Sequence, residues 1–514
     1  MTSTSAPAEE KRGSFSSRRV FILAAIGSAV GLGNIWRFPY VAYENGGGAF
    51  VIPYLVALLT AGLPFLFLDY AVGHHYRGSA PLSFRRIARW AEPLGWWQVG
   101  ITFVIAVYYA AVIAWAGRYM FFSLDQAWGG DPEAFLFGEF LQAGDPGIGF
   151  DYVSGVTIPL VLVWVVTLVV LALGVQRGIG ATAVVFIPIL LVAFAALVVV
   201  ALTLDGAGTG LDALFTPDWA ALTETSVWVA AFGQIFFSLS VGFGIMITYA
   251  SYVDRKSDMT GSGLVVGFAN SGFELLAGIG VFAALGFMAT AAGVGVNEVA
   301  TDGLGLAFIA FPTIISEAPG GALIGVLFFG SLVIAGLTSL ISVIEVPISA
   351  VRDKFQLGRV AASMAVGLPA AVLSIVLLGT TTGVYVLDVV DHFINQFGIL
   401  LVAVVSMVAL SWIFGRTRLL QRHLNRTGSV RLGAWWRWLI GIVTPIVLTF
   451  ILVREFIANI EEPYEGYPGW LLGSLGWGLC AAVILLSIPL SLLPWRKDVD
   501  LSDPEPLETT EGRA

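Results

Sequence analysis

Long apolar runs recur along the whole chain, and they constrain its fold more than any other feature. Each run is long enough to cross about 30 Å of hydrocarbon as a helix. Hydrophobic residues make up 57% of the 514 residues and charged residues only 12%, a balance typical of a polytopic membrane protein. We therefore predict an all-α membrane protein with twelve transmembrane helices. The predicted spans are 20–43, 49–73, 97–123, 156–174, 180–203, 226–252, 262–289, 321–350, 360–379, 385–414, 438–459 and 469–494.

Basic residues gather in alternate loops of this arrangement. The loops without any Lys or Arg are 124–155, 204–225, 290–320, 380–384 and 460–468. By the positive-inside rule, both termini should lie in the cytoplasm and the chain should be a multi-pass protein of the plasma or inner cell membrane. The formal net charge of −9 does not suggest nucleic acid as a partner, so membrane lipid is the expected surrounding.

Two of the spans are interrupted by closely similar motifs. The first contains AVGLGN (29–34) and the sixth contains SVGFGI (240–245). Five spans separate the copies, so the two halves should cross the membrane in opposite directions. Glycine-interrupted spans at corresponding positions of two halves indicate a transporter binding site, because unwound backbone in lipid is tolerated where it lines a cavity. Close helix packing through small residues is the alternative explanation.

Three segments strongly resemble the neurotransmitter:sodium symporter family, particularly its bacterial amino-acid transporters. They are GSAVGLGNIWRFPYVAYENGGGAFVIPY (27–54), GQIFFSLSVGFGIMITYASYV (233–253) and AGLTSLIS (335–342). The resemblance implies a five-plus-five inverted repeat with broken helices 1 and 6 and two extra spans. The implied parts are a cytoplasmic segment 1–19, the repeats 20–203 and 226–414, the spans within 438–494, and an acidic cytoplasmic tail 495–514.

The resemblance also implies a site for a zwitterion. A half-helix that starts after the first break offers free N–H groups to a carboxylate. These would be the N–H groups of Leu32 and Gly33, together with the hydroxyl of Tyr109. The ammonium group would meet carbonyls of Ala29, Phe237 and Ser238. Monoamine transporters of the family carry Asp where this chain has Gly31, which leaves room for a substrate with its own carboxylate.

The implied side-chain pocket is apolar and carries no charge. It is lined by Ile105, Tyr109, Phe237, Ser240, Phe243, Ser339 and Val343. Neutral aliphatic or aromatic amino acids should therefore fit best. A difference of one methylene is worth only about 1–3 kcal/mol, so the pocket does not single out one substrate.

Two sodium sites follow from the resemblance, since Na⁺ prefers hard oxygen ligands as Ca²⁺ and Mg²⁺ do. The first comprises Ala29, Asn34, Ser238 and Asn270 with the substrate carboxylate. The second comprises Gly27, Val30, Ala335, Thr338 and Ser339. Asn34 by itself is also explained as a hydrogen-bonding residue between helices.

Glu274 is a carboxylate inside a predicted span, which is a functional hypothesis by default. Chloride-dependent members of the family have Ser at the matching position and bind chloride there. Beside Tyr54 and Gln234, Glu274 would supply this negative charge itself, so no chloride requirement is expected. A protonated glutamate in the core and a role in proton antiport are the alternatives.

Two charged pairs resemble the gates of the family. Arg37 and Asp391 match the external pair, with help from Gln234, and Arg12 and Asp353 match the cytoplasmic pair. Arg12 is alternatively one more charge of the positive-inside pattern.

These features predict a sodium-coupled, chloride-independent symporter that imports neutral hydrophobic L-amino acids by alternating access. A biogenic amine or a small zwitterionic osmolyte is the alternative substrate. A channel or a transport-dead receptor is disfavoured by the complete ligand and gate sets, and an enzyme by the lack of any nucleophile–base set in the sequence. The sequence leaves open whether the chain forms a homodimer.

Overall fold

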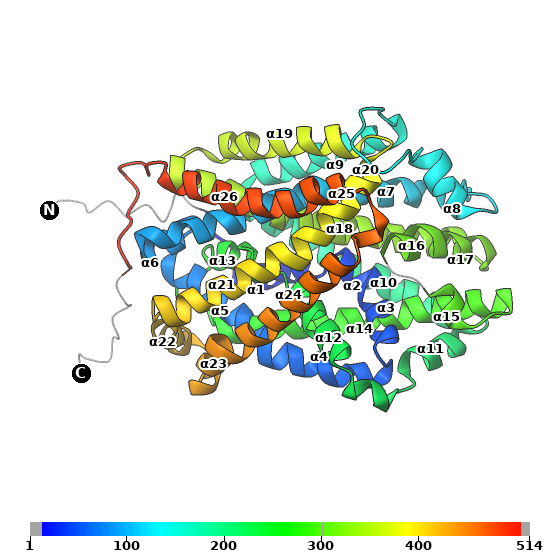
Figure 1. Cartoon of the computed structure of the whole chain (residues 1–514), viewed down its shortest axis with the longest axis horizontal. Coiled ribbons are helices and arrows are strands. Elements are labelled where there is room, and N and C mark those ends of the chain that lie inside the picture. Colours follow the sequence, from blue (N-terminus) through cyan, green and yellow to red (C-terminus); the bar gives the residue numbers. More distant parts are fainter. Residues whose placement is uncertain (1–12, 301–302, 505–514) are drawn as a thin grey trace.

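The computed structural model describes residues 13–300 and 303–504. Over these residues the chain is helical and forms no strand, only the isolated bridges Gly47–Pro217 and Tyr152–Thr380. Most helices run along the long axis of the molecule (Figure 1). The first-half helices are α1 (Arg18–Ala29), α2 (Leu32–Trp36), α3 (Phe38–Glu44), α4 (Val51–Ala57), α5 (Leu63–Tyr76), α6 (Ala80–Ile87), α7 (Glu92–Phe122), α8 (Pro132–Ala134), α9 (Ser154–Ala172), α10 (Ala181–Leu202) and α11 (Ala207–Phe215).

The rest of the chain continues in the same way. Its helices are α12 (Thr225–Ser238), α13 (Ile245–Ala250), α14 (Met259–Ala292), α15 (Val296–Val299), α16 (Gly303–Gly305), α17 (Phe311–Glu317), α18 (Gly321–Phe355), α19 (Arg359–Leu378), α20 (Gly383–Phe393), α21 (Leu400–Val408), α22 (Thr417–Thr427), α23 (Ala434–Trp438), α24 (Thr444–Glu461), α25 (Gly469–Leu471) and α26 (Leu479–Leu492).

Short π-helical turns join many of these helices into longer ones. They are Leu58–Gly62, Phe135–Phe140, Val175–Gly180, Leu306–Ala310, Ile394–Ile399, Ala409–Ile413, Leu439–Val443 and Leu472–Gly478. Pro64, Pro312 and Pro445 each follow such a turn by two residues. Proline lacks the N–H that would bond one turn back, and a local π adjustment keeps the remaining backbone groups paired inside the membrane.

Ten helices within the described ranges are long and apolar enough to cross a bilayer, and the bent pair α1 and α2–α3 raises the count to eleven. The ten are Gly48–Tyr76, Arg89–Phe122, Ser154–Ala172, Val175–Leu202, Met259–Ala292, Gly321–Phe355, Arg359–Leu378, Gly383–Ile413, Ala434–Gly466 and Gly469–Leu492. Each coincides with a predicted span. The predicted span 226–252 is instead two short helices, α12 and α13.

The first break lies between α1 and α2, whose axes bend by 58°. Val30 leaves the helical conformation with φ −75° and ψ 94°. Gly31 is extended, and its N–H donates to Oδ1 of Asn34 at 2.9 Å. The asparagine side chain thus binds a backbone group that the interrupted helix leaves without its usual partner.

The second break separates α12 from α13 and is built from left-handed backbone. Ser240, Gly242 and Gly244 have φ values of 53°, 89° and 90°. Glycine adopts this region without the steric cost that a Cβ brings. Asp69 on α5 supports the break, because its Oδ2 accepts the N–H of Gly242 at 3.0 Å.

Two predicted loops contain helices that pack on the bundle. In loop 204–225, α11 lies so close to α14 that a Cβ at Gly210 would lie 1.7 Å from the carbonyl oxygen of Phe282. In loop 290–320, the ring of Phe311 on α17 stacks on Phe328 of α18 with centroids 3.6 Å apart. The described parts of both loops therefore pack on the bundle and are more than simple connections.

Candidate functional site

The two breaks meet at one backbone carbonyl. The carbonyl of Ser28, near the end of α1, accepts the hydroxyl of Ser240 at 3.1 Å and that of Ser339 at 3.2 Å. The α12–α13 break and the middle of α18 are thereby tied to α1. Sequence reasoning missed Ser28, since a backbone carbonyl carries no sequence signal beyond its position beside the motif.

A buried polar triad lies beside this junction. The Asn34 amide nitrogen donates to Oδ1 of Asn270 at 2.9 Å and to Oγ of Ser238 at 3.4 Å, and the Asn270 amide donates to the same serine. None of the three is more than 2% exposed. The structure therefore brings together three residues predicted for the first sodium site. The fourth, Ala29, is the buried last residue of α1.

The residues predicted for the second sodium site gather where α1 passes α18. A Cβ at Gly27 would lie 3.3 Å from Cβ of Thr338. The Thr338 hydroxyl donates to the carbonyl of Ala335 at 3.0 Å. Val30, which directly follows α1, is buried. These side-chain and carbonyl oxygens are of the type that a hard cation prefers.

The residues predicted to hold the substrate surround the start of α2. The N–H of Leu32 donates to Oη of Tyr109 at 3.2 Å. A Cβ at Gly31 would lie 2.9 Å from the same oxygen and 3.5 Å from Oγ of Ser339, and a Cβ at Gly33 would lie 2.1 Å from the ring of Phe237. Glycine at both positions thus lets aromatic side chains approach the backbone.

The apolar members of the predicted pocket extend from the same faces. Ile105 lies four residues before Tyr109 on α7, and Val343 lies four residues after Ser339 on α18, so each pair shares a helix face. Phe243 lies within the second break. Ile105, Phe243 and Val343 are 6%, 5% and 4% exposed.

Glu274 is wholly buried on α14 and bonded on two sides. Tyr54 donates its hydroxyl to one carboxylate oxygen, and Gln234 donates its amide to the other at 2.6 Å. A further hydrogen bond joins Glu274 to Ser238 of the triad. The structure therefore brings together the carboxylate and both predicted neighbours, at the edge of the predicted first sodium site.

The two predicted outer gate residues, Arg37 and Asp391, interact with one another. The Arg37 guanidinium lies 4.8 Å from the ring centroid of Phe237. Asp391 on α20 interacts electrostatically with Arg37 and accepts the amide of Asn395 at 2.7 Å. Asn395 also donates to Tyr108 at 3.3 Å. Neither Asn395 nor Tyr108 was predicted.

The predicted inner pair lies at the opposite end. Arg12 lies outside the described residues, so Asp353 is the only member of this pair that the structure describes. Oδ2 of Asp353 accepts the N–H of Ser79 at 2.8 Å. Nearby, sequence reasoning missed a buried cluster in which Glu345 accepts both Tyr252 and Arg359 at 2.7 Å. An acidic residue within a predicted span was the available signal.

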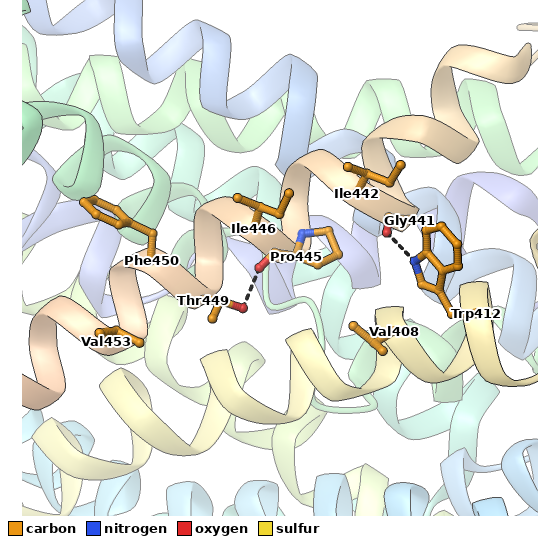
Figure 2. Close-up of a pocket in the computed structure, with 9 residues that line it drawn as sticks. All are labelled: Val408, Trp412, Gly441, Ile442, Pro445, Ile446, Thr449, Phe450 and Val453. Carbon is orange, nitrogen blue, oxygen red and sulfur yellow. Dashed lines mark hydrogen bonds between the residues drawn. The ribbon is translucent and has the colours of Figure 1, made fainter.

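A surface pocket between α21 and α24 is a different kind of feature (Figure 2). Its polar groups are bonded within the wall, Trp412 to the carbonyl of Gly441 and Thr449 to that of Pro445, both at 2.7 Å. The remaining lining is aliphatic or aromatic. Such a surface suits lipid chains rather than a charged solute.

Comparisons with known proteins match the chain over nearly its whole length. The family model described as "Sodium:neurotransmitter symporter family" matches residues 12–131 and 129–496. An uncharacterized sodium-dependent transporter of Methanocaldococcus jannaschii is 40% identical over 89% of this chain and 93% of its own. The human sodium- and chloride-dependent neutral and basic amino acid transporter B(0+) is 30% identical over 93% and 84%. The sodium- and chloride-dependent taurine transporter of Rattus norvegicus is 31% identical over 94% and 84%.

Proposed function

Because this chain belongs to the sodium:neurotransmitter symporter family, we propose that it is a sodium-coupled symporter importing neutral hydrophobic L-amino acids by alternating access. Its family and its apolar helices make it a multi-pass membrane transporter rather than an enzyme. The observation that carries the proposal is the meeting of two broken helices at the carbonyl of Ser28, next to the triad of Asn34, Ser238 and Asn270.

The topology belongs to the same proposal. The helices α12 and α13 together form one broken span, which brings the number of spans from eleven to twelve. Residues 20–203 and 226–414 form the two inverted repeats, 438–494 adds two spans, and both termini lie in the cytoplasm beside a cell membrane. The equivalent interruptions at 29–34 and 240–245 support the repeat. The first begins directly after Ser28, and the second contains Ser240, whose hydroxyl donates to the Ser28 carbonyl.

In this proposal the substrate carboxylate lies at the start of α2, near Leu32, Gly33 and Tyr109. Its ammonium group faces carbonyls of Ala29, Phe237 and Ser238. The Leu32–Tyr109 hydrogen bond supports this arrangement, because it holds the tyrosine hydroxyl beside a backbone N–H at the start of α2. The human relative's name, a neutral and basic amino acid transporter, supports an amino acid as substrate.

Two sodium ions would bind beside the substrate. Asn34, Asn270 and Ser238 with the Ala29 carbonyl would hold the first. Gly27, Val30, Ala335, Thr338 and Ser339 would hold the second. Moving each charge across about 100 mV yields about 2.3 kcal/mol, so two ions supply about 4.6 kcal/mol for uptake before their concentration gradient is counted.

A small osmolyte is the second candidate substrate, since the rat relative is named a taurine transporter. A biogenic amine is less favoured. An amine brings no carboxylate, and Gly31 has no side chain to replace that charge.

Uptake by the full-length protein in proteoliposomes tests the main proposal. Labelled leucine, phenylalanine, glycine, taurine and dopamine would be offered with sodium, chloride and pH varied separately. We expect leucine or phenylalanine uptake that requires a sodium gradient. If taurine were the one solute with sodium-dependent uptake, an osmolyte would be the substrate. If no solute showed sodium-dependent uptake, sodium coupling would be overturned.

Glu274 carries the proposal that chloride is not required. The human and rat relatives are named sodium- and chloride-dependent, whereas the archaeal relative is named sodium-dependent only. We expect wild-type uptake to persist when gluconate replaces chloride, and the variant Glu274→Ser to need chloride. Glu224→Ser, at an exposed glutamate, is the control and should stay chloride-independent. Wild-type uptake that stops without chloride would contradict this role.

A further inference from the structure

A basic pocket lies at one end of the bundle, away from the candidate site. It has a volume of about 320 Å³, and its charged or titratable lining consists of Arg416, Arg418, Arg422, Arg426, His75 and His423. Among the described residues that line it, none is acidic. Because arginine stays charged at any physiological pH, the pocket concentrates four positive charges in a small volume.

The folding of α22 creates this concentration. Arg418, Arg422 and Arg426 follow one another at four-residue spacing, so they lie on one face of the helix. Leu420 and Leu424 are buried on the other face. Like charges at this spacing destabilise a helix. An anion in the pocket would relieve that repulsion.

One anion already reaches the pocket from the end of the chain. A carboxylate oxygen of Asp503 lies 2.8 Å from Arg416, and its other oxygen lies 3.8 Å from Nε2 of His75. Arg86 holds this segment through two hydrogen bonds to the carbonyl of Asp500, at 3.0 and 2.8 Å. The tail therefore presents a carboxylate to the rim of the pocket.

His75 is the buried part of the binding surface. His75 is 7% exposed, and its Nε2 has no hydrogen-bond partner among the described residues. A buried polar atom without a partner costs about 1–3 kcal/mol. The distance to Asp503 is too long for a good hydrogen bond, so a larger anion that enters more deeply would satisfy this nitrogen better than the carboxylate does.

The neighbouring histidines are held neutral. His74 Nε2 lies 2.9 Å from the carbonyl of Asp254, which can only accept. In the neutral ring, Nδ1 of His74 is then an acceptor, and Nε2 of His423, 2.8 Å away, donates to it. Burial, together with His74, His75 and Arg426, lowers the pKa of His423 to about 2. The positive charge of the pocket at neutral pH thus comes from its arginines.

Aromatic side chains place this pocket near the height of a membrane surface. Trp90 and Trp412 are 62% and 65% exposed, and the ring of Phe414 in the pocket wall lies 4.4 Å from that of Trp90. Exposed tryptophans are typical of the interface between lipid and water. Headgroup phosphates are the anions concentrated at that height.

We propose that this pocket binds the phosphate of an anionic phospholipid headgroup, and that Asp503 pairs with Arg416 of the pocket when no lipid is bound. Arginine can pair with phosphate through two parallel hydrogen bonds, whereas Arg416 makes a single hydrogen bond to Asp503. The tail is then an intramolecular competitor of the lipid.

Native mass spectrometry of the full-length protein tests the site by counting bound phosphatidylglycerol against phosphatidylcholine. The variant R422Q/R426Q removes two exposed arginines, and R19Q/R431Q removes two other exposed arginines of the chain. We expect the first variant to bind phosphatidylglycerol about tenfold more weakly or worse, with wild-type binding in the second. An equal loss in both variants would show only general charge attraction and would overturn the site.

Two further measurements fix the source of the phosphate and the role of the tail. D503N should bind phosphatidylglycerol more tightly than the wild type, whereas D498N, at an acid outside the observed contacts, should not. Inorganic phosphate should not displace the lipid at millimolar concentration. Displacement would assign the pocket to a soluble anion, and an unchanged affinity in D503N would remove the tail as competitor. Unchanged melting temperatures in phosphatidylcholine show that each variant is folded.

Discussion

At the scale of single residues, the side chain of Asn34 makes three hydrogen bonds to three different parts of the chain. Its Oδ1 accepts the N–H of Gly31, while its amide donates to Asn270 and Ser238. One side chain thus joins the first break to α12 and α14. Asn34 therefore stabilises the fold and is also a proposed sodium ligand. The first role affects the melting temperature, and the second affects the sodium dependence of uptake.

We expect Asn34→Ala to abolish sodium-dependent uptake or to raise its half-saturating sodium concentration about tenfold or more. The variant leaves buried partners unsatisfied, which costs about 1–3 kcal/mol of stability. Asn297→Ala, at an exposed residue of α15, is the control and should change neither. If Asn34→Ala lowered only the melting temperature and kept the wild-type sodium dependence, the residue would be structural.

The polar residues that gather at the breaks were largely predictable, but their hydrogen-bond partners were not. Asn34 and Asn270 were predicted from the family resemblance, and the structure brings them together. The acceptor at Ser28 was not predicted, because every residue has a carbonyl and only packing selects one. Asp69 shows the same limit. The sequence marks it as a carboxylate within a span, whereas its bond to Gly242 requires α5 to lie beside the second break.

At the scale of elements, the two breaks differ in construction. The first uses extended backbone at Val30 and Gly31 with a side-chain cap from Asn34. The second uses left-handed backbone at Ser240, Gly242 and Gly244. Glycine content predicted both breaks, since glycine favours non-helical conformations, but it did not predict which of the two solutions each break adopts.

We expect Gly244→Ala to lower stability by about 1–2 kcal/mol, because alanine is strained in the left-handed conformation. Its Cβ would also lie 3.1 Å from Cγ1 of Val346. Gly233→Ala on α12 is the matched control. No atom lies within 4 Å of its added Cβ, and in a helix the change should stabilise by about 0.5–1 kcal/mol. Thermal unfolding in detergent would measure both. Equal effects at the two positions would argue against strain at the break.

At the scale of the whole molecule, a buried ion pair ties three distant elements together. Nζ of Lys354, at the end of α18, lies 2.5 Å from the carboxylate of Glu92 at the start of α7. It also donates to the carbonyl of Leu490 on α26 at 2.7 Å. The side chains of the pair are 0% and 2% exposed. The last span is thereby anchored to the bundle.

Lys354→Met should therefore lower stability by about 3–5 kcal/mol, since it leaves Glu92 buried without its closest positive partner. The double variant Glu92→Gln/Lys354→Met should recover part of this loss. Lys497→Met, at an exposed lysine, should be neutral. Melting temperatures in one detergent would test the series, and a double variant less stable than Lys354→Met would contradict a simple charge effect.

The sequence by itself determined which helices are long and apolar enough to cross a membrane and where two helices break. Both properties are local, because span length follows from consecutive apolar residues and the breaks follow from glycine within them. Only the tertiary structure decided which groups pair: Ser28 with two serines, Glu92 with Lys354, and Asp503 with Arg416. These partners lie far apart in sequence, and hydrogen-bonding groups of one type are chemically alike. The choice among them therefore depends on the packing that brings one pair within reach and separates the others.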